Sequence, residues 1–265
     1  MDSLPEGLDQ RFLEYIGVTE EAEREMHSFY LQFFRPGQQA LELGCGVGYF
    51  VKMLGELGVN VTGIDLDPAA VTKAQSQTLP VIQAEAISYL QELPGESLDA
   101  IFSAHLIEHL EVETVFSLIR ASYRVLRPGG FLLLTTPNVR ALVSHLEMFW
   151  LHFDHKRFYH PRLVEFFMRE CQFDEISFGE NGKNYDYAAS GDTITVTGGK
   201  FNWNSVIPRP KHVVMLPWWW FKHWLARMVV LPYLATLIPP QYVGRSFEVY
   251  IVGYKTNSSA KSKAS

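Results

Sequence analysis

The sequence predicts an α/β fold, in which helices cover both faces of a doubly wound, mostly parallel β-sheet. Short apolar runs with strand character alternate with longer segments of helical spacing, as in parallel strands joined by helices. A glycine-rich turn separates the first strand from the helix after it, and an acidic residue ends the second strand. The composition is 47% hydrophobic and 20% charged, which suits a globular chain with a buried core.

The chain opens with a helical segment, predicted over residues 1–35. Apolar and aromatic residues recur at helical spacing across 8–34, with a break near Gly17. The turn sequence RPG ends this segment at 35–37, because proline and glycine favour turns over helix. We therefore expect helices that precede the α/β domain.

Five strands are predicted up to Pro137, each bounded by turn residues or a helix. These strands cover residues 39–44, 59–65, 79–86, 97–105 and 130–137. The helices between them are predicted at 49–57, 68–77 and 111–126. Crossovers between parallel strands are right-handed, which gives a doubly wound sheet.

The pattern changes after Pro137. The predicted elements are then a helix at 161–171 and strands at 173–180 and 245–255. We expect residues 36–180 and the final strand to form one domain, with 181–244 inserted before that strand. Residues 256–265 are small, polar and basic, which is typical of a disordered tail.

Charge, cysteine usage and hydropathy argue against several classes of protein. The formal net charge is -6, so a nucleic-acid partner is not expected. Cys45 and Cys171 lie far apart, which indicates no disulfide framework and favours a reducing, cytoplasmic setting. We expect no signal peptide, because the N-terminal sequence lacks a basic segment followed by an apolar run. We expect no spanning helix, because no run of about 18 uncharged apolar residues occurs.

The turn after the first strand carries Gly44, Gly46 and Gly48. Glycines at such a turn permit positive φ and let a ligand approach the backbone without meeting a Cβ. The second strand ends at Asp65, where a carboxylate can accept hydrogen bonds from both hydroxyls of a ribose. These features together predict a nucleoside-containing ligand.

The spacing of this turn, ExGxGxG from Glu42, differs from the GxGxxG of dinucleotide sites. The segment LELGCGVG (41–48) resembles the first motif of the class I S-adenosylmethionine (SAM) dependent methyltransferases. The resemblance continues along the chain in the family's order. The further segments are VTGIDLDP (61–68), AEA (84–86), LDAIFSAHLIEHL (98–110) and LRPGGFLLLTTPN (126–138).

The resemblance implies a Rossmann-like, seven-stranded sheet whose last strand is antiparallel and lies between the fifth and sixth. It also implies that the glycine loop holds the amino-acid end of SAM, Asp65 the ribose and Glu85 the adenine, where the family usually has aspartate. Cys45 is interpreted as a small residue packed under the cofactor, with a reactive thiol as the alternative. The implied SAM-binding residues are Glu42, Gly44, Cys45, Gly46, Gly48, Asp65, Leu66, Glu85, Ala86 and Ser103.

A group of histidines follows the fourth strand, in HLIEH (105–109) and FDHKRF (153–158). If a helix begins at His105, residues at i, i+3 and i+4 share one face. HLIEH is similar to the ExxEH metal motif of the ubiquinone-biosynthesis O-methyltransferases and of the small-RNA 2′-O-methyltransferases, although His105 replaces the first glutamate. The implied metal ligands are His105, Glu108, His109 and His155. An imidazole-rich set favours Zn²⁺, Fe²⁺ or Mn²⁺ over Mg²⁺.

Three interpretations of this group stay open. A bound cation would lower the pKa of an acceptor hydroxyl. Without metal, His109 or His155, with Glu108 beside them, would remove the proton as the catalytic base. The EH pair would otherwise be structural support. His152 and His160 are expected to be surface or packing residues.

The segment 213–240 contains three consecutive tryptophans and a helix predicted over 218–231. It is interpreted as a lid over an apolar pocket, or as a helix at the membrane surface. Residues 181–212 are predicted to form a covering hairpin or loop. Both interpretations favour a hydrophobic or lipid-linked acceptor and, in the second, peripheral contact of a cytoplasmic protein with a membrane.

The predicted function is SAM-dependent methylation of a hydroxyl oxygen on a hydrophobic or lipid-linked small molecule or a glycan intermediate, with a divalent metal as an optional cofactor. The alternatives are N- or C-methylation of a small molecule and a SAM-binding protein without turnover. Methylation of small RNA is disfavoured by the negative net charge.

Overall fold

A computed structural model describes residues 5, 7–142, 144–145, 149–183, 186–187, 194–195 and 246–256. The tryptophan segment 213–240 with its predicted helix, most of the insertion, and 257–265 of the predicted tail lie outside the described residues. No helix of the described part combines the length and the apolar character needed to cross a bilayer.

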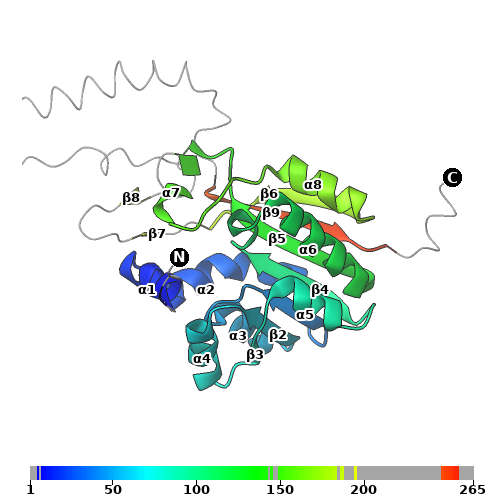
Figure 1. Ribbon diagram of the computed structural model, residues 1–265, viewed down its shortest axis with the longest axis horizontal. Helices are drawn as coiled ribbons and strands as arrows, with labels where there is room; N and C mark the ends of the chain where they lie inside the picture. The colour runs from blue at the N-terminus through cyan, green and yellow to red at the C-terminus, as the bar shows by residue number, and fades with distance from the viewer. Residues whose placement is uncertain are drawn as a thin grey trace, which may run out of the picture.

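Seven strands form one sheet in the order β3-β2-β1-β4-β5-β9-β6 (Figure 1). The first five strands are parallel to one another, and β9 is antiparallel to both of its neighbours, β5 and β6. The strands are β1 (Gln39–Leu43), β2 (Asn60–Asp65), β3 (Val81–Gln83), β4 (Leu98–Ala104), β5 (Leu126–Pro137), β6 (Asp174–Glu180) and β9 (Glu248–Tyr254). The predicted fold class and the place of the last strand are confirmed.

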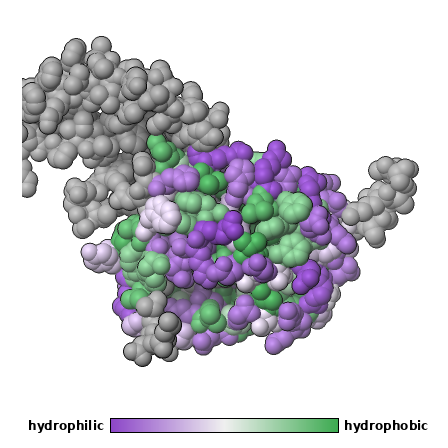
Figure 2. Space-filling view, turned by 45° about the horizontal axis from the view of Figure 1, so that its top comes forward, coloured by the Kyte–Doolittle hydropathy of each residue, from purple (hydrophilic) through white to green (hydrophobic). Residues whose placement is uncertain are grey.

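Helices cover both faces of the sheet (Figure 1). One face buries a core under α5 (Ala86–Glu92), α6 (Val112–Val125) and α8 (Pro161–Glu170). The other buries an aromatic-rich core under the 3₁₀ helix η1 (Phe29–Phe33), α3 (Tyr49–Glu56) and α4 (Pro68–Ser76). The helical segment predicted at the start forms α1 (Leu8–Tyr15), α2 (Glu20–Ser28) and η1. On the face shown in Figure 2, hydrophobic residues lie in small groups among hydrophilic ones.

Two local predictions were wrong. The third strand is predicted over 79–86 but ends at Gln83, because the carboxylate of Glu85 accepts hydrogen bonds from the backbone N–H groups of Ile87 and Ser88 and so begins α5. The fifth strand begins at Leu126, earlier than expected. In the region of the predicted hairpin, the short strands β7 (Asp186–Tyr187) and β8 (Ile194–Thr195) pair antiparallel.

Candidate active site

The glycine loop leads from β1 into α3 at the carboxyl edge of the sheet. Gly44, Gly46 and Gly48 have φ of 69°, 53° and 80°, the left-handed region that glycine adopts without strain. A Cβ built on Gly46 would meet no atom within 4 Å, so space for a ligand lies beside the loop. The N–H of Gly46 donates to a carboxylate oxygen of Asp65 over 2.7 Å. The two predicted halves of the nucleoside site are therefore adjacent.

Cys45 belongs to this loop, and its sulfur packs closely against Gly63 of β2. A Cβ built on Gly63 would be 2.7 Å from that sulfur. Burial raises the pKa of the Cys45 thiol far above its ordinary value, and the nearby carboxylates of Glu42 and Asp65 raise it further. The thiol is therefore protonated and enclosed, which favours the packing interpretation over a reactive thiol.

Glu42 of β1 lies beneath the loop and is only 3% exposed. Its Oε2 atom has no hydrogen-bond partner among the described residues. Burial raises the pKa of Glu42 well above its ordinary value, and the negative charges of Glu23 and Asp65 raise it further. A buried carboxyl oxygen without a partner is unfavourable, so this position fits a site that receives a hydrogen-bond donor or a cation from a ligand.

The remaining residues implied to bind SAM differ in their surroundings. Ser103 is buried and donates to the carbonyl of Leu43, which fixes the end of β1 against β4. Leu66 is 65% exposed, and Ala86 is the first residue of α5. Both carboxylate oxygens of Glu85 accept hydrogen bonds from the first turn of α5, so its side chain is held by its own helix.

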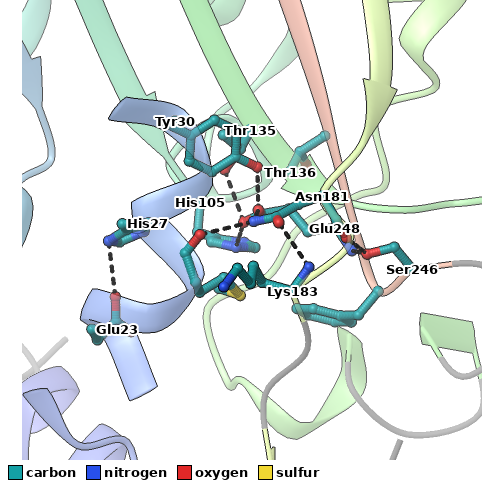
Figure 3. Close-up of polar contacts among 12 residues, drawn as sticks. Glu23, His27, Tyr30, His105, Thr135, Thr136, Asn181, Lys183, Ser246 and Glu248 are labelled. Atoms are coloured by element: carbon teal, nitrogen blue, oxygen red, sulfur yellow. Dashed lines mark hydrogen bonds and ion pairs between the residues drawn. The ribbon is translucent and has the colours of Figure 1, made fainter. Parts of the chain in front are cut away.

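His105 follows β4 with a φ of 48°, a strained conformation for a residue other than glycine. Its Nδ1 lies 3.0 Å from Glu108, and its Nε2 lies 2.6 Å from Glu248 of β9. Figure 3 shows the side chains around Glu248 directed toward its carboxylate. The carboxylate of Glu248 also accepts hydrogen bonds from the hydroxyl of Tyr30, the hydroxyl of Thr135 at 3.2 Å and the amide of Asn181 at 2.9 Å.

Opposite charges stabilise this buried network. Burial alone would raise the pKa of Glu248, but the hydrogen bond and charge of His105 hold it at about 2. Burial would likewise lower the pKa of His105, yet Glu108 and Glu248 raise it well above its ordinary value. The pKa of Glu108 is lowered, against its burial, by the hydrogen bond from His105. An imidazolium thus lies between two carboxylates and donates to both.

The structure divides the predicted metal ligands into two groups. His105 and Glu108 bind each other, and the second oxygen of Glu108 accepts from the hydroxyl of Thr136 at 3.2 Å. The physical reason is that no helix begins at His105. His105 has a positive φ, and only Ile107–His109 form a short 3₁₀ turn, η2, so His105 and His109 do not lie on one helix face. His109 and His155 instead approach His152.

Sequence reasoning missed Glu248, Tyr30 and Asn181 as members of the site. The sequence could have pointed to Glu248, because a carboxylate in an otherwise apolar, buried strand needs a polar partner. Tyr30 and Asn181 had none, since nothing in the sequence relates them to β9. His160, expected to be a packing residue, accepts a hydrogen bond from the backbone of Arg162 at the start of α8.

Comparison with known proteins agrees with this geometry. Residues 41–134 match the family model described as a methyltransferase domain. The ubiquinone biosynthesis O-methyltransferases of Pseudomonas aeruginosa and Xanthomonas campestris are 34% and 35% identical over 110 and 108 residues. These matches span 38% and 39% of this chain, and 45% and 44% of the relatives, so they cover less than half of either protein.

The fold is also found among solved structures. A SAM-dependent methyltransferase from Archaeoglobus fulgidus superposes with a TM-score of 0.68 at 20% identity, over 93% of this chain and 99% of that one. The domain match, the strand order and the loop geometry lead to one conclusion. Residues 41–134 form the core of a class I SAM-dependent methyltransferase domain, similar in sequence to the ubiquinone-type enzymes.

Proposed function

We propose that this protein transfers the methyl group of SAM to a hydroxyl oxygen of a hydrophobic or lipid-linked small molecule or glycan intermediate. The observation that carries the proposal is the contact between the glycine loop and Asp65 at the carboxyl edge, within the segment that matches the methyltransferase domain. Doubly wound sheets bind their ligands at this edge.

SAM, when bound, supplies a methyl group on a sulfonium, which is already a good leaving group. The residues of the chain then have to bind SAM and orient its methyl group. The carboxylate of Asp65 accepts from the ribose hydroxyls. Glu42 pairs with the α-ammonium group at the amino-acid end of SAM. A cation beside its unpartnered oxygen offsets the unfavourable free energy of burying that carboxyl group.

On the acceptor side, the chain has to align the attacking oxygen and remove its proton. We assign that role to His155, because one of its ring nitrogens has a free lone pair. Its Nδ1 lies 2.6 Å from the carbonyl of Phe149 and donates to it, which leaves Nε2 as the acceptor nitrogen. Burial lowers the pKa of His155 to about 4, so its ring is neutral at physiological pH. In this scheme, which applies when His155 holds no metal ion, the proton passes from the acceptor oxygen to Nε2 as the new carbon–oxygen bond forms.

Oxygen is favoured as the methylated atom by the ubiquinone-biosynthesis relatives, whose names specify O-methylation. The apolar, tryptophan-rich sequence at 213–240 favours a hydrophobic acceptor. The test is to incubate the full chain with methyl-labelled SAM and lipid, quinone and glycan extracts. We expect a labelled methyl ether in the lipid or quinone fraction. Label on nitrogen or carbon would contradict the O-methyltransferase assignment, and absence of label from all three extracts would contradict the acceptor class.

The cofactor part of the proposal has a separate test. Asp65→Ala is expected to weaken SAM binding by roughly 1.5–3 kcal/mol, because the charge-assisted hydrogen bonds to the ribose are lost. Isothermal titration with SAM and with its demethylated product measures this change. Asp67→Asn is the matched control, since asparagine also caps α4 at the position where Asp67 accepts from Ala69. Equal affinity of the wild type and Asp65→Ala would contradict the assignment of the ribose to Asp65.

A further inference from the structure

Three histidines gather beside the carboxyl edge of the sheet. His109 ends the η2 turn, and His152 and His155 follow the short helix α7 (Phe149–Leu151). The rings of His152 and His155 are stacked with centroids 4.8 Å apart, and each lies within 5.0 Å of the ring of His109. One nitrogen from each ring can be chosen so that all three atoms lie within 4.8 Å of one another. We infer that His109, His152 and His155 bind a divalent transition-metal ion, with Zn²⁺ as the best match.

Two of the three rings are already oriented as metal ligands usually are. Metal-binding histidines donate their second ring N–H to a backbone carbonyl or a carboxylate, which fixes the ring and its tautomer. His155 has such a carbonyl partner in Phe149, at 2.6 Å. The Nδ1 of His109 lies 3.4 Å from a carboxylate oxygen of Asp154. In both rings Nε2 is then the nitrogen left to coordinate.

Charge favours a metal ion over protons at this position. Only a neutral imidazole ring has a lone pair that can bind a metal ion. Three protonated rings at these separations would repel one another, whereas one dication is attracted by all three lone pairs.

The nitrogens must move closer before they can coordinate an ion. A tetrahedral zinc site places its nitrogens about 3.3 Å apart. The three ring nitrogens that lie within 4.8 Å of one another therefore have to approach by up to roughly 1.5 Å, which side-chain rotation can supply. His152 is the ring that has to rearrange, since its Nδ1 accepts a 3.3 Å hydrogen bond from the backbone of Asp154. Coordination through Nε2 would put a proton on Nδ1 and end that contact.

The donor set and its surroundings favour Zn²⁺ over Mg²⁺. Three imidazole nitrogens suit a borderline ion, whereas Mg²⁺ prefers oxygen and an octahedral shell. Aromatic rings lie beside the group: the ring of Phe149 is 4.7 Å from that of His155, and the ring of Phe12 is 5.4 Å from that of His152 and nearly perpendicular to it. Apolar neighbours of this kind strengthen the attraction between the ion and its ligands.

The test uses untagged, full-length protein that has been treated with a chelator. CoCl₂ is titrated and the visible absorption recorded, because Co²⁺ absorbs strongly when four-coordinate; ZnCl₂ is then added as competitor. We expect one ion per chain and displacement of Co²⁺ by Zn²⁺. His152→Ala should weaken binding by about 100-fold, and Asp154→Asn by about 10-fold through the lost support of His109. His160→Asn is the matched control, because it removes a histidine and keeps the cap of α8.

Unchanged Co²⁺ affinity in His152→Ala, or no intense Co²⁺ absorption in the wild type, would overturn the inference and leave an aromatic packing cluster. SAM titration of each variant shows whether it is folded, and His152→Gln repeats the measurement if the alanine variant is not. Metal coordination and the proposed proton transfer use the same Nε2 lone pair of His155, so they are alternatives for that atom. The proposed binding of SAM does not depend on which of them applies. A wild type that binds SAM but not Co²⁺ refutes only the metal site, and the reverse result refutes only the proposed function.

Discussion

At the scale of single residues, the carboxylate of Glu248 connects four segments that are distant in the sequence. It accepts hydrogen bonds from Tyr30 of η1, His105 after β4, Thr135 of β5 and Asn181 after β6. A buried carboxylate is stable only when it is paired in this way, so all four donors have to be present together. Glu248 therefore ties the last strand to the edge of the sheet where the acceptor is proposed to bind.

Glu248→Gln is expected to lower the free energy of unfolding by roughly 3 kcal/mol, because it leaves the imidazolium of His105 with one carboxylate instead of two. The folded pKa of Glu248 is about 2, below its ordinary 4.5, so its contribution is present above pH 4.5 and disappears as the pH falls toward 2. The pKa of His105 is raised above 6.5, so its contribution is complete below pH 6.5 and disappears as the pH rises through the raised value. The difference between wild type and variant should thus be largest between pH 4.5 and 6.5.

Urea denaturation at several pH values measures this difference. Glu175→Gln is the matched control on the neighbouring strand β6, because Glu175 is exposed, and we expect it to change stability by no more than about 0.5 kcal/mol. A Glu248→Gln variant whose stability follows the wild type across the whole pH range would show that the pair with His105 contributes nothing.

The residues of the candidate site could be named from the sequence more easily than their pairing. His105, Glu108, His109 and His155 were all identified as chemically important, and all lie at the carboxyl edge. Their partners depend on whether a helix begins at His105, and a segment of five residues carries too little periodicity to decide this. The resemblance to the ExxEH motif implied that His105 binds a metal ion, whereas in the structure its Nε2 contacts Glu248, which the motif does not include.

At the scale of elements, α5 shows where local propensity was insufficient to predict the end of a strand and the start of a helix. The run LPVIQAEA has strand character throughout, and glutamate is not among the preferred N-cap residues, so the sequence signals no helix after Gln83. In the structure the Glu85 carboxylate satisfies two N–H groups of the first turn and the hydroxyl of Ser88. Its role as a cap therefore became visible only with the coordinates.

Glu85→Ala is expected to reduce stability by about 1 kcal/mol, because the first N–H groups of α5 lose their acceptors. Glu85→Asp should retain most of that stability, since aspartate is a preferred cap. Thermal unfolding of the two variants without SAM checks both values. SAM titration of the same pair separates the cap from the adenine contact implied by the family resemblance. A loss of SAM affinity in Glu85→Ala with unchanged thermal stability would favour the adenine contact.

At the scale of the whole molecule, the alternation of strands and helices predicted the doubly wound, mostly parallel sheet, because parallel crossovers are right-handed. The family resemblance implied the place of the antiparallel last strand. Each predicted strand from 39 to 137 has an observed counterpart, and the alternating residues of the last strand matched its antiparallel place beside β5. The region 181–244 could not be treated in this way. Its polar-aromatic and tryptophan-rich composition fits no strand–helix alternation, so it suggested a type of acceptor and no topology.

Deletion of residues 213–240 is expected to leave SAM binding intact and to abolish methylation of the hydrophobic acceptor. The SAM-binding residues proposed above lie between Glu42 and Ser103 and all precede the deleted segment, whereas both the lid and the membrane interpretation give 213–240 the task of receiving an apolar acceptor. Calorimetry with SAM reports whether the shortened chain is folded, and the labelled-methyl assay reports acceptor turnover. The two interpretations separate on vesicles: if the segment lies at a membrane surface, the intact chain co-sediments with liposomes and the deletion variant does not, whereas a lid leaves both in the supernatant. A shortened chain that binds SAM and methylates the acceptor at the wild-type rate would remove this segment from the acceptor site altogether.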